Sequence, residues 1–332
     1  MAQVVIGDEP ASILVGKSAN PTVVREPGEE VTYSVLVANE SDTESVTIST
    51  LDDDIYGSLD GVGTCPTLPF TLAALEVMRC EFTEMVTGDF GDPPVVDIIT
   101  ADGPGIDPKS DDASVRIADV AASIEVTKTA IPTSLPEPGG TFTYELQVQN
   151  TSPVDDVTIT NIIDDPYGDL NGQGSCAIGQ TLAPGEIYTC SFDRDFFGGP
   201  GALQANVISV TATDSDGGTE FDYDFATVFI TDVPSSLGVT KTPNVTQQVA
   251  GGSVIYTVSV DNTSPVDEVT LSSMQDDPYG DITTVAGDIT ATTCSLVPTI
   301  TLLPGDNYTC QFTATVNGAI GEMIMDTVSI AG

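Results

Sequence analysis

Three copies of an acidic motif are the residues of this chain best suited to bind a cation. They span Asp53–Gly57, Asp164–Gly168 and Asp276–Gly280, and each reads Asp-Asp, then Ile or Pro, then Tyr-Gly. Carboxylate and carbonyl oxygens are the ligands that Ca²⁺ prefers. Asp, Pro and Gly at these spacings are also typical of a type I turn, which we expect more often at any single copy. The candidate ligands here are Asp53, Asp54, Asp164, Asp165, Asp169, Asp276, Asp277 and Asp281.

Two further acidic groups could supply ligands. Asp214 and Asp216 precede Asp222 and Asp224, with a loose counterpart at Asp102, Asp107, Asp111 and Asp112. An aspartate also recurs at Asp8, Asp119 and Asp232, where one repeat passes into the next. None of these spacings is that of an EF-hand loop. Because the net charge of −42 must be screened, we predict that the chain as a whole binds structural Ca²⁺.

Catalytic chemistry is poorly represented. The chain has no His, which is the usual general base and a common metal ligand. Carboxylate pairs of the glycosidase type are available by residue type, but every candidate pair recurs in each repeat. A structural device repeats in this way more readily than an active site, so we predict that the protein is not an enzyme.

The lysines are placed as regularly as the acids. Three of the four, Lys17, Lys128 and Lys241, hold equivalent positions in the first predicted strand of each repeat. A salt bridge, or a stem that lies along apolar surface with its ammonium in water, is the expected role. An isopeptide crosslink to a last-strand aspartate is the minor alternative, and the junction aspartates are the partners that the sequence suggests for it.

Six cysteines fall two to a repeat, always 14 to 16 residues apart. With no His and no Cys-x-x-Cys, a zinc site is disfavoured. One disulfide per repeat is the simplest pairing, and each would stabilise its domain by about 3 kcal/mol. The pairs point to an oxidising, extracellular setting, and they are Cys65 with Cys80, Cys176 with Cys190, and Cys294 with Cys310.

The repeat of about 111 residues reads as all-β. Residues 142–150 alternate apolar and polar side chains, and 31–39 and 254–262 repeat the pattern with a tyrosine in register. Glycine-rich turns separate the short runs, as in a sandwich. We therefore predict three tandem immunoglobulin-like β-sandwich domains in an elongated rod, at 9–120, 121–233 and 234–332, with the third lacking its last strand.

Several runs resemble a known type of repeat. They are Val126-Thr-Lys-Thr-Ala, Gln149-Asn-Thr-Ser-Pro, Asp164-Asp-Pro-Tyr-Gly-Asp-Leu and Leu182-Ala-Pro-Gly-Glu-Ile-Tyr-Thr-Cys. Together they resemble the Ig-like repeats of unknown function in very large bacterial and archaeal surface proteins. The resemblance covers the whole chain, and the first repeat departs from it most. It implies an extracellular array in a stalk, fibre or adhesin, and it brings no catalytic residues.

Residues 2–8 read as a closing strand without its own domain. Val4 and Ile6 match Val228 and Ile230 of the second repeat, whereas the third repeat stops short of this strand. Donated to the third domain of a neighbouring copy, the strand with Val4, Val5 and Ile6 would build a head-to-tail filament. The alternative is a window from a longer array, in which residues 2–8 close a preceding domain.

The predicted function is thus a structural segment of an extracellular filament. A calcium-dependent adhesin stalk, with carbohydrate binding as an option, is the alternative. The negative charge argues against nucleic acid and anionic membranes as partners, and no apolar run approaches the length of a membrane span. Five sequons are candidate glycosylation sites, at Asn39, Asn150, Asn244, Asn262 and Asn307.

Overall fold

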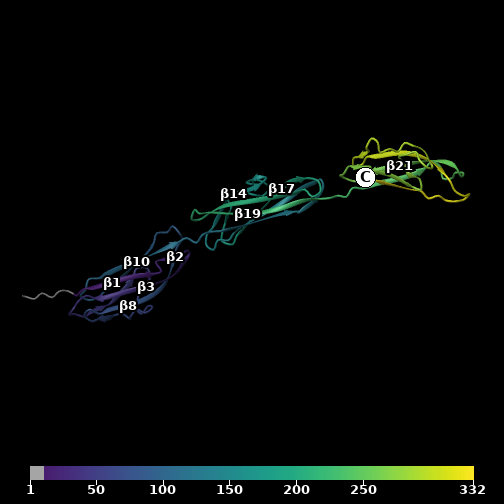
Figure 1. The fold of residues 1–332 in the computed structure, drawn as a ribbon. Helices are drawn as coiled ribbons and strands as arrows, with labels where there is room; N and C mark the ends of the chain where they lie inside the picture. The colour runs from purple at the N-terminus through teal and green to yellow at the C-terminus, as the bar shows by residue number, and fades with distance from the viewer. Residues whose placement is uncertain (1–10) are drawn as a thin grey trace, which may run out of the picture. The chain divides into compact units, whose positions relative to one another are not determined.

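The computed structural model describes residues 11–332, and within that range it contains strands and turns but no helix (Figure 1). The all-β, sandwich-type prediction is therefore confirmed. Because there is no helix in this range, none is long and apolar enough to cross a membrane. The proposed donor strand, with Asp8, lies outside the described residues.

The first repeat folds into two main sheets and a small one. One sheet has the order β1-β3-β8 and the other β2-β10-β9-β5-β6, while β4 pairs with β7. The short β2 runs parallel to β10, and the other pairs are antiparallel. The strands are β1 (Ile13–Asn20), β2 (Val23–Arg25), β3 (Gly28–Asn39), β4 (Val46–Ile48), β5 (Thr50–Asp53), β6 (Gly57–Ser58), β7 (Phe70–Leu72), β8 (Val77–Thr87), β9 (Val95–Asp102) and β10 (Lys109–Ala118).

The second repeat has the same strand orders, β11-β13-β17 and β12-β19-β18-β14-β15, with β16 paired to β14. Again the short strand, β12, pairs in parallel with a long one, β19. The strands are β11 (Ile124–Ile131), β12 (Ser134–Pro136), β13 (Gly139–Asn150), β14 (Val157–Asp165), β15 (Gly168–Asp169), β16 (Thr181–Leu182), β17 (Ile187–Phe197), β18 (Leu203–Asp214) and β19 (Thr219–Thr231).

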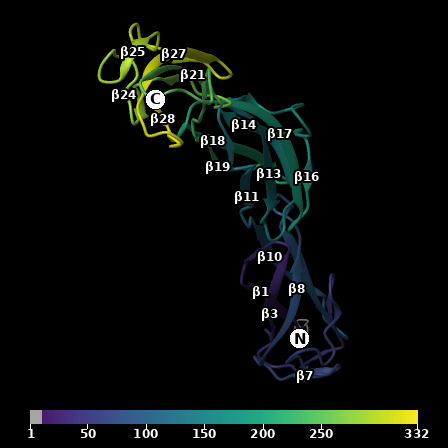
Figure 2. The same cartoon turned by 90° about the vertical axis from the view of Figure 1, so that its right-hand side faces the viewer.

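The third repeat, whose strands β21, β24, β25, β27 and β28 are labelled in Figure 2, differs in its second sheet. Its sheets have the orders β20-β21-β27-β25, β24-β23-β28 and β22-β26, so among described strands β28 pairs only with β23. The strands are β20 (Leu237–Pro243), β21 (Gly252–Asn262), β22 (Val269–Thr270), β23 (Ser273–Asp277), β24 (Gly280–Asp281), β25 (Ile289–Thr292), β26 (Thr301–Leu302), β27 (Asn307–Val316) and β28 (Thr327–Ala331).

By compactness the chain divides into two units rather than three. One comprises residues up to Thr127 together with Leu146–Cys190 and Ile208–Asp224, and the other comprises Lys128–Glu145, Ser191–Val207 and Phe225–Gly332. The three predicted domain boundaries therefore stay a prediction, although the sheet orders follow the sequence repeat.

The cores form where the alternation predicts them. In β13, Phe142, Tyr144, Leu146 and Val148 are buried while intervening residues reach the surface. The predicted tyrosine register holds, since Tyr33, Tyr144 and Tyr256 stack on Phe82, Phe192 and Phe312 with centroid distances of 5.2, 5.4 and 5.0 Å. Such offset aromatic pairs add roughly 0.5–1.5 kcal/mol each beyond area burial.

All three predicted disulfides are present: Cys65–Cys80, Cys176–Cys190 and Cys294–Cys310. Each joins a loop cysteine to the long strand β8, β17 or β27, and no described cysteine is free. They tie the loop to the layer that carries the stacked aromatic residues.

Three of the five sequon asparagines are structural. Asn39, Asn150 and Asn262 are at most 2% exposed. The side-chain amide of Asn150 donates to the carbonyls of Asp155 and Leu182, and its oxygen accepts from the amide of Ser152. Asn262 makes the equivalent bonds. In the folded chain these amides have no room for a glycan, whereas glycosylation at the exposed Asn244 and Asn307 stays a prediction.

Candidate functional site

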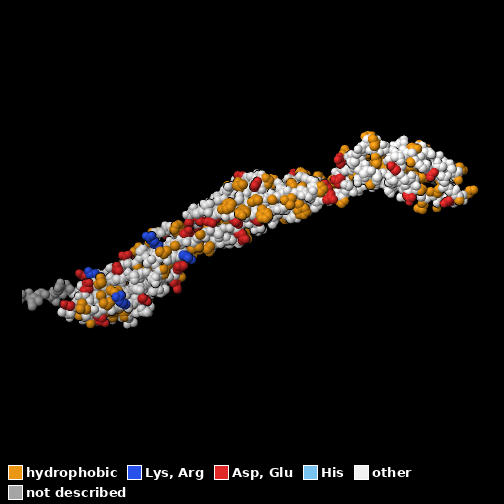
Figure 3. Space-filling view, viewed as in Figure 1, with side chains coloured by type: hydrophobic (Ala, Val, Ile, Leu, Met, Phe, Trp, Pro, Cys, Tyr) orange, Lys and Arg blue, Asp and Glu red, His pale blue; other side chains and the backbone are white. Residues whose placement is uncertain are grey.

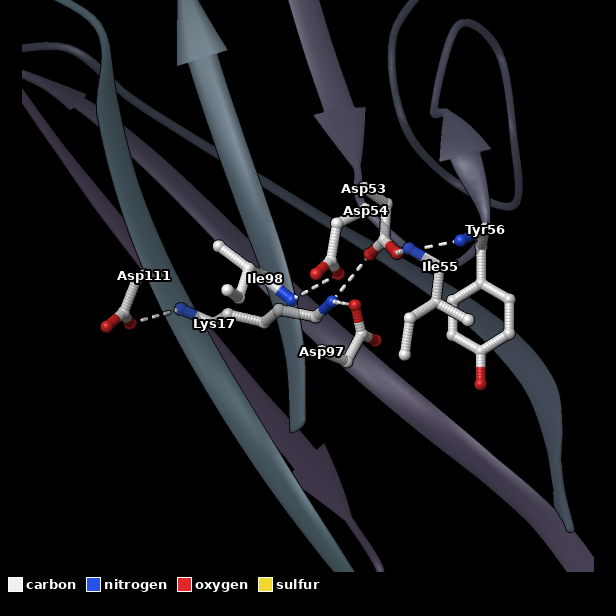
Figure 4. Close-up of polar contacts among 8 residues, drawn as sticks. All are labelled: Lys17, Asp53, Asp54, Ile55, Tyr56, Asp97, Ile98 and Asp111. Carbon is white, nitrogen blue, oxygen red and sulfur yellow. Dashed lines mark hydrogen bonds and ion pairs between the residues drawn. The ribbon is translucent and has the colours of Figure 1, made fainter. Parts of the chain in front are cut away.

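A lysine lies between two aspartates in the core of the first repeat (Figure 4). Lys17 Nζ is 2.5 Å from Asp53 Oδ2 and also contacts Asp97 Oδ1. All three side chains are fully shielded from solvent. Lys17 belongs to β1, Asp53 to β5 and Asp97 to β9, so the contact joins the two sheets. The predicted salt bridge is confirmed, and the alternative of an ammonium in water is wrong.

Aromatic rings close the same space. Nζ of Lys17 lies 4.7 Å from the ring centroid of Tyr33 and 5.5 Å from that of Phe82. Ring faces attract a cation, and here they also exclude water from the amine. Burial raises the pKa of Asp97 to about 7, with the neighbouring Asp53 adding to the rise. Burial also acts to raise the pKa of Asp53, but Asp97, Lys17 and a backbone amide outweigh it and lower that pKa.

The third repeat builds the same cluster from equivalent residues. Lys241 Nζ is 2.5 Å from Asp276 Oδ2 and contacts Asp326 Oδ1. The rings of Tyr256 and Phe312 lie 4.1 and 5.0 Å from the amine. Burial lowers the pKa of Lys241, and Asp276 acts in the opposite direction.

In the second repeat, Lys128 has the same aromatic neighbours, Tyr144 at 4.8 Å and Phe192 at 5.4 Å. Asn206 takes the place that Asp97 and Asp326 hold in the other repeats. Its side chain is fully buried, and neither of its amide atoms has a hydrogen-bond partner. This position therefore carries a carboxyl group or a carboxamide, according to the repeat.

The acidic motif acts as a turn and supplies this core. Asp53 Oδ1 accepts hydrogen bonds from the amides of Ile55 and Tyr56, and Asp164 accepts one from Tyr167. Asp53, Asp54 and Asp97 also lie close enough together to suggest a cation site. The ammonium of Lys17 already balances that charge, and Asp54 accepts from the amide of Ile98. We therefore do not assign calcium to Asp53 or to its equivalent Asp276.

The remaining residues of the motif prediction lie at the surface. Asp165 and Asp277 are exposed. Asp169 and Asp281 are exposed as well, and each accepts from the backbone amide two residues further on. Calcium binding by these four residues stays a prediction.

A separate carboxylate cluster lies at the passage from the first repeat to the second. One oxygen from each of Glu26, Asp119, Asp155 and Asp216 lies within 4.8 Å of the others. Glu26 and Asp155 are each 6% exposed. Both oxygens of Glu26 accept from backbone amides, of Phe90 and Val120. Among the described residues, no lysine or arginine forms an ion pair with these four carboxylates.

Two oxygen atoms of this cluster are buried without a hydrogen-bond partner. They are the Oδ2 atoms of Asp155 and Asp216. Burial raises the pKa of Asp155, and the neighbouring Glu26, Asp214 and Asp119 raise it further. Asp216 is shifted in the same direction, again first by burial. Like charges gathered in a partly buried place favour either protonation or a bound cation.

An equivalent cluster recurs one repeat later. Glu137, Asp232 and Asp267 also place one oxygen each within 4.8 Å of one another. They are the repeat counterparts of Glu26, Asp119 and Asp155. Glu137 accepts from the amide of Val233 as Glu26 does from Val120. The recurrence shows that the arrangement belongs to the repeat.

Some of the predicted metal ligands lie in these clusters, and metal binding by them stays a prediction. Asp119, Asp216 and Asp232 fall in the clusters, whereas Asp214 instead accepts from the backbone amides of its own turn. Glu26, Glu137, Asp155 and Asp267 were not expected. Their signal was present in the sequence, in the recurrent Glu-Pro-Gly turn and the recurrent Ser-Pro-Val-Asp run.

The comparisons with known proteins yield structures only. No protein-family model and no curated protein matches the chain. A structure of a 1.5-MDa bacterial ice-binding adhesin is 14% identical, with 98% of each chain covered and a TM-score of 0.29. A Ca²⁺-stabilised adhesin of an Antarctic bacterium is 14% identical over 98% of this chain and 73% of that one, with a TM-score of 0.25. A structure of red sea bream transglutaminase is 12% identical, with 66% of this chain and 31% of that chain covered and a TM-score of 0.26. At these values the likeness carries no argument about function.

The charge of the junction cluster should make the stability of the folded chain depend on pH. The folded-state pKa of Asp155 is raised, so without a divalent cation the folded chain holds protons that the unfolded chain releases. The contribution of Asp155 to the free energy of unfolding therefore falls as the pH rises from the ordinary carboxyl pKa to the raised one. In chelator, we expect Asp155→Asn to raise stability near neutral pH by an amount on the order of 1 kcal/mol. Urea unfolding from about pH 5 to pH 7 measures this, and a variant that tracks the parent at every pH contradicts it.

Proposed function

We propose that this chain is a structural segment of an extracellular surface fibre or adhesin stalk, with Ca²⁺ bound where consecutive repeats meet. The recurrence of the junction cluster carries the proposal. Glu26, Asp119 and Asp155 have counterparts at Glu137, Asp232 and Asp267. A device that recurs at two successive junctions suits a load-bearing array better than a single site of chemistry.

Several properties support the extracellular setting. The three disulfides suit an oxidising compartment. Acidic side chains recur along the face drawn in Figure 3, where basic ones are few. Millimolar Ca²⁺ outside cells would screen such a surface and bind its densest carboxylate groups, because weak extracellular sites have dissociation constants of about 10⁻⁴–10⁻³ M.

Calcium should stabilise the folded chain through the junction clusters. Added Ca²⁺ at about 100 times its dissociation constant should contribute about 2.7 kcal/mol to unfolding stability. Calorimetric titration into chelated protein should show binding that Asp155→Asn weakens at one site while the site of Asp267 remains. Thermal unfolding with and without EGTA measures the stabilisation.

Asp165→Asn is the matched control for this experiment, because it removes an exposed carboxylate of the turn motif. It should leave calcium binding by the junction clusters unchanged. If Asp165→Asn abolished binding and Asp155→Asn did not, calcium would belong to the turn motif. Equal melting in EGTA and in Ca²⁺ would remove the calcium proposal altogether.

We further propose that copies of this chain join head to tail, the third repeat of one receiving the strand at residues 2–8 of the next. The support is an uncovered face in the third repeat. Val239 of β20 is 36% exposed, whereas its equivalents Val15 and Val126 are 6% and 5% exposed. An open groove of about 800 Å³ lined by Val254, Tyr256, Val316 and Ile324 lies beside β20. An incoming strand with apolar residues at alternate positions has the right pattern to cover it.

Assembly should depend on which face of that strand is changed. Val4→Asp with Ile6→Asp should abolish concentration-dependent oligomers in light scattering and filaments in electron micrographs. Gln3→Asp with Val5→Asp alters the alternate positions and should preserve both. Monodisperse single chains from the parent protein at high concentration would contradict assembly, yet would leave the stalk function intact.

One observation favours carbohydrate binding as a second candidate function. Not all aromatic residues lie in the cores: Phe221 and Tyr223 of β19 are 62 and 61% exposed. They occupy alternate positions of one strand and so share a face. Exposed rings in a row are suited to stack on sugar rings.

Substitution on β19 tests this candidate. On a glycan array, Tyr223→Ser should lose any signal that the parent chain gives. Leu203→Ser, which removes an equally exposed aliphatic side chain, should retain it. Absence of binding by the parent chain across the array would count against a carbohydrate-binding role and would not bear on the calcium proposal.

A further inference from the structure

We propose that the buried lysines form intramolecular amide crosslinks, Lys17 with Asp97, Lys128 with Asn206 and Lys241 with Asp326. The crosslink would join the first strand of each repeat to the strand that pairs with the acidic-motif strand. It does not depend on calcium or on assembly, because every atom involved lies within one repeat.

The geometry of the first repeat carries the inference. Lys17 Nζ lies in contact with the carboxyl group of Asp97, yet neither oxygen of Asp97 has a hydrogen-bond partner. The amine therefore meets that carboxyl group outside the directions in which its oxygens accept hydrogen bonds. Asp53, by contrast, accepts a hydrogen bond of 2.5 Å from the same amine. One carboxyl group is placed as a proton acceptor and the other as the group under attack.

The third repeat repeats this asymmetry. Lys241 donates to Asp276 at 2.5 Å, while both oxygens of Asp326 lack a hydrogen-bond partner despite contact with the amine. The backbone register is the same as well. Asp53 lies opposite Ile99 and Asp276 opposite Val328, so Asp97 and Asp326 each stand two residues before that pair. Two independent copies of one arrangement argue against an accident of side-chain placement.

The chemistry balances without any other reactant. Asp53 takes a proton from the Lys17 ammonium, and the neutral amine attacks Cγ of the protonated Asp97. The tetrahedral centre loses one amine proton, its hydroxyl group takes a proton, and water leaves. The products are a secondary amide between Nζ and Cγ, one water and a protonated Asp53. Neither oxidation nor reduction occurs.

The surroundings favour that reaction over a persistent ion pair. Burial raises the pKa of Asp97 to about 7, so this carboxyl group stays protonated below that pH. A protonated carboxyl group can lose water when an amine attacks it. In the third repeat, burial lowers the pKa of the Lys241 amine and so favours the neutral, nucleophilic form. Holding the two groups in contact is worth effective molarities of roughly 10⁵–10⁸ M. The crosslink also removes the ammonium charge from the core, where desolvation disfavours an ion.

The second repeat extends the inference to a carboxamide. Asn206 is fully buried with both amide atoms unpartnered, which is costly unless the group has another role. Attack of the Lys128 amine on its Cγ would release ammonia and give the same amide product. A buried aspartate, Asp164, stands at the sequence equivalent of Asp53.

Intact-mass measurement on the fully reduced, denatured chain tests the proposal directly. The expected mass is lower than the sequence mass by two waters and one ammonia, after the N-terminal residue has been verified. Peptide mapping should then recover branched peptides that join Lys17 to Asp97 and Lys241 to Asp326. A mass equal to that of the sequence would overturn the proposal.

Three substitutions make the test independent of folding defects. Asp97→Asn should give a chain of the same final mass as the parent, because loss of ammonia then replaces loss of water. Asp53→Asn should keep the shape but lose the proton acceptor, so that its mass deficit relative to its own sequence is smaller by one water. Lys109→Arg changes the one lysine outside the first strands and should retain the full mass deficit. An Asp97→Asn chain that is folded by circular dichroism and has its complete sequence mass would contradict the mechanism.

Discussion

A lysine buried in each of the three repeats is the constraint on which the rest of the architecture depends. An isolated ammonium in a protein core costs several kcal/mol, so it must be met by carboxyl groups at close range. Lys17 comes from one sheet, and Asp53 and Asp97 come from the other. The pair is made only when both sheets have the correct register and face each other, because a slip of one residue turns a side chain to the opposite face.

The same constraint divides the acidic residues of the chain into two populations. Those in the core have an amine as partner and aromatic rings above it, so their charge is balanced from within the repeat. Those of the junction clusters have mainly like-charged neighbours, which is why the pKa of Asp155 is raised by burial and then by Glu26, Asp214 and Asp119. Balance at the junctions must therefore come from solvent, by protons or by a divalent cation. A chain with net charge −42 thus combines acids balanced by a lysine in the core with acids balanced from solvent at the junctions.

Much of the fold could be predicted because strand periodicity is a local property. The alternation around Tyr144 predicted its burial, and the paired cysteines predicted their bridges from spacing alone. The site was harder to predict. Asp97 lies in a run of apolar residues with no motif around it, and Asn206 shares neither its charge nor its neighbours. Only the pairing of β9 with β5, and the packing of that sheet on β1, brings Asp97 to Lys17.

The sequence by itself determined the class of fold, the three disulfides, the repeat and the presence of a regularly placed lysine among recurrent acids. These follow from residue type and spacing, which act over a few residues. The tertiary structure alone decided which acids meet: that Asp53 caps a turn with one oxygen and holds Lys17 with the other, and that Glu26 meets Asp155 far along the chain. Such contacts join residues separated by dozens of positions. Sheet register and packing set these distances, and neither can be computed from local pattern.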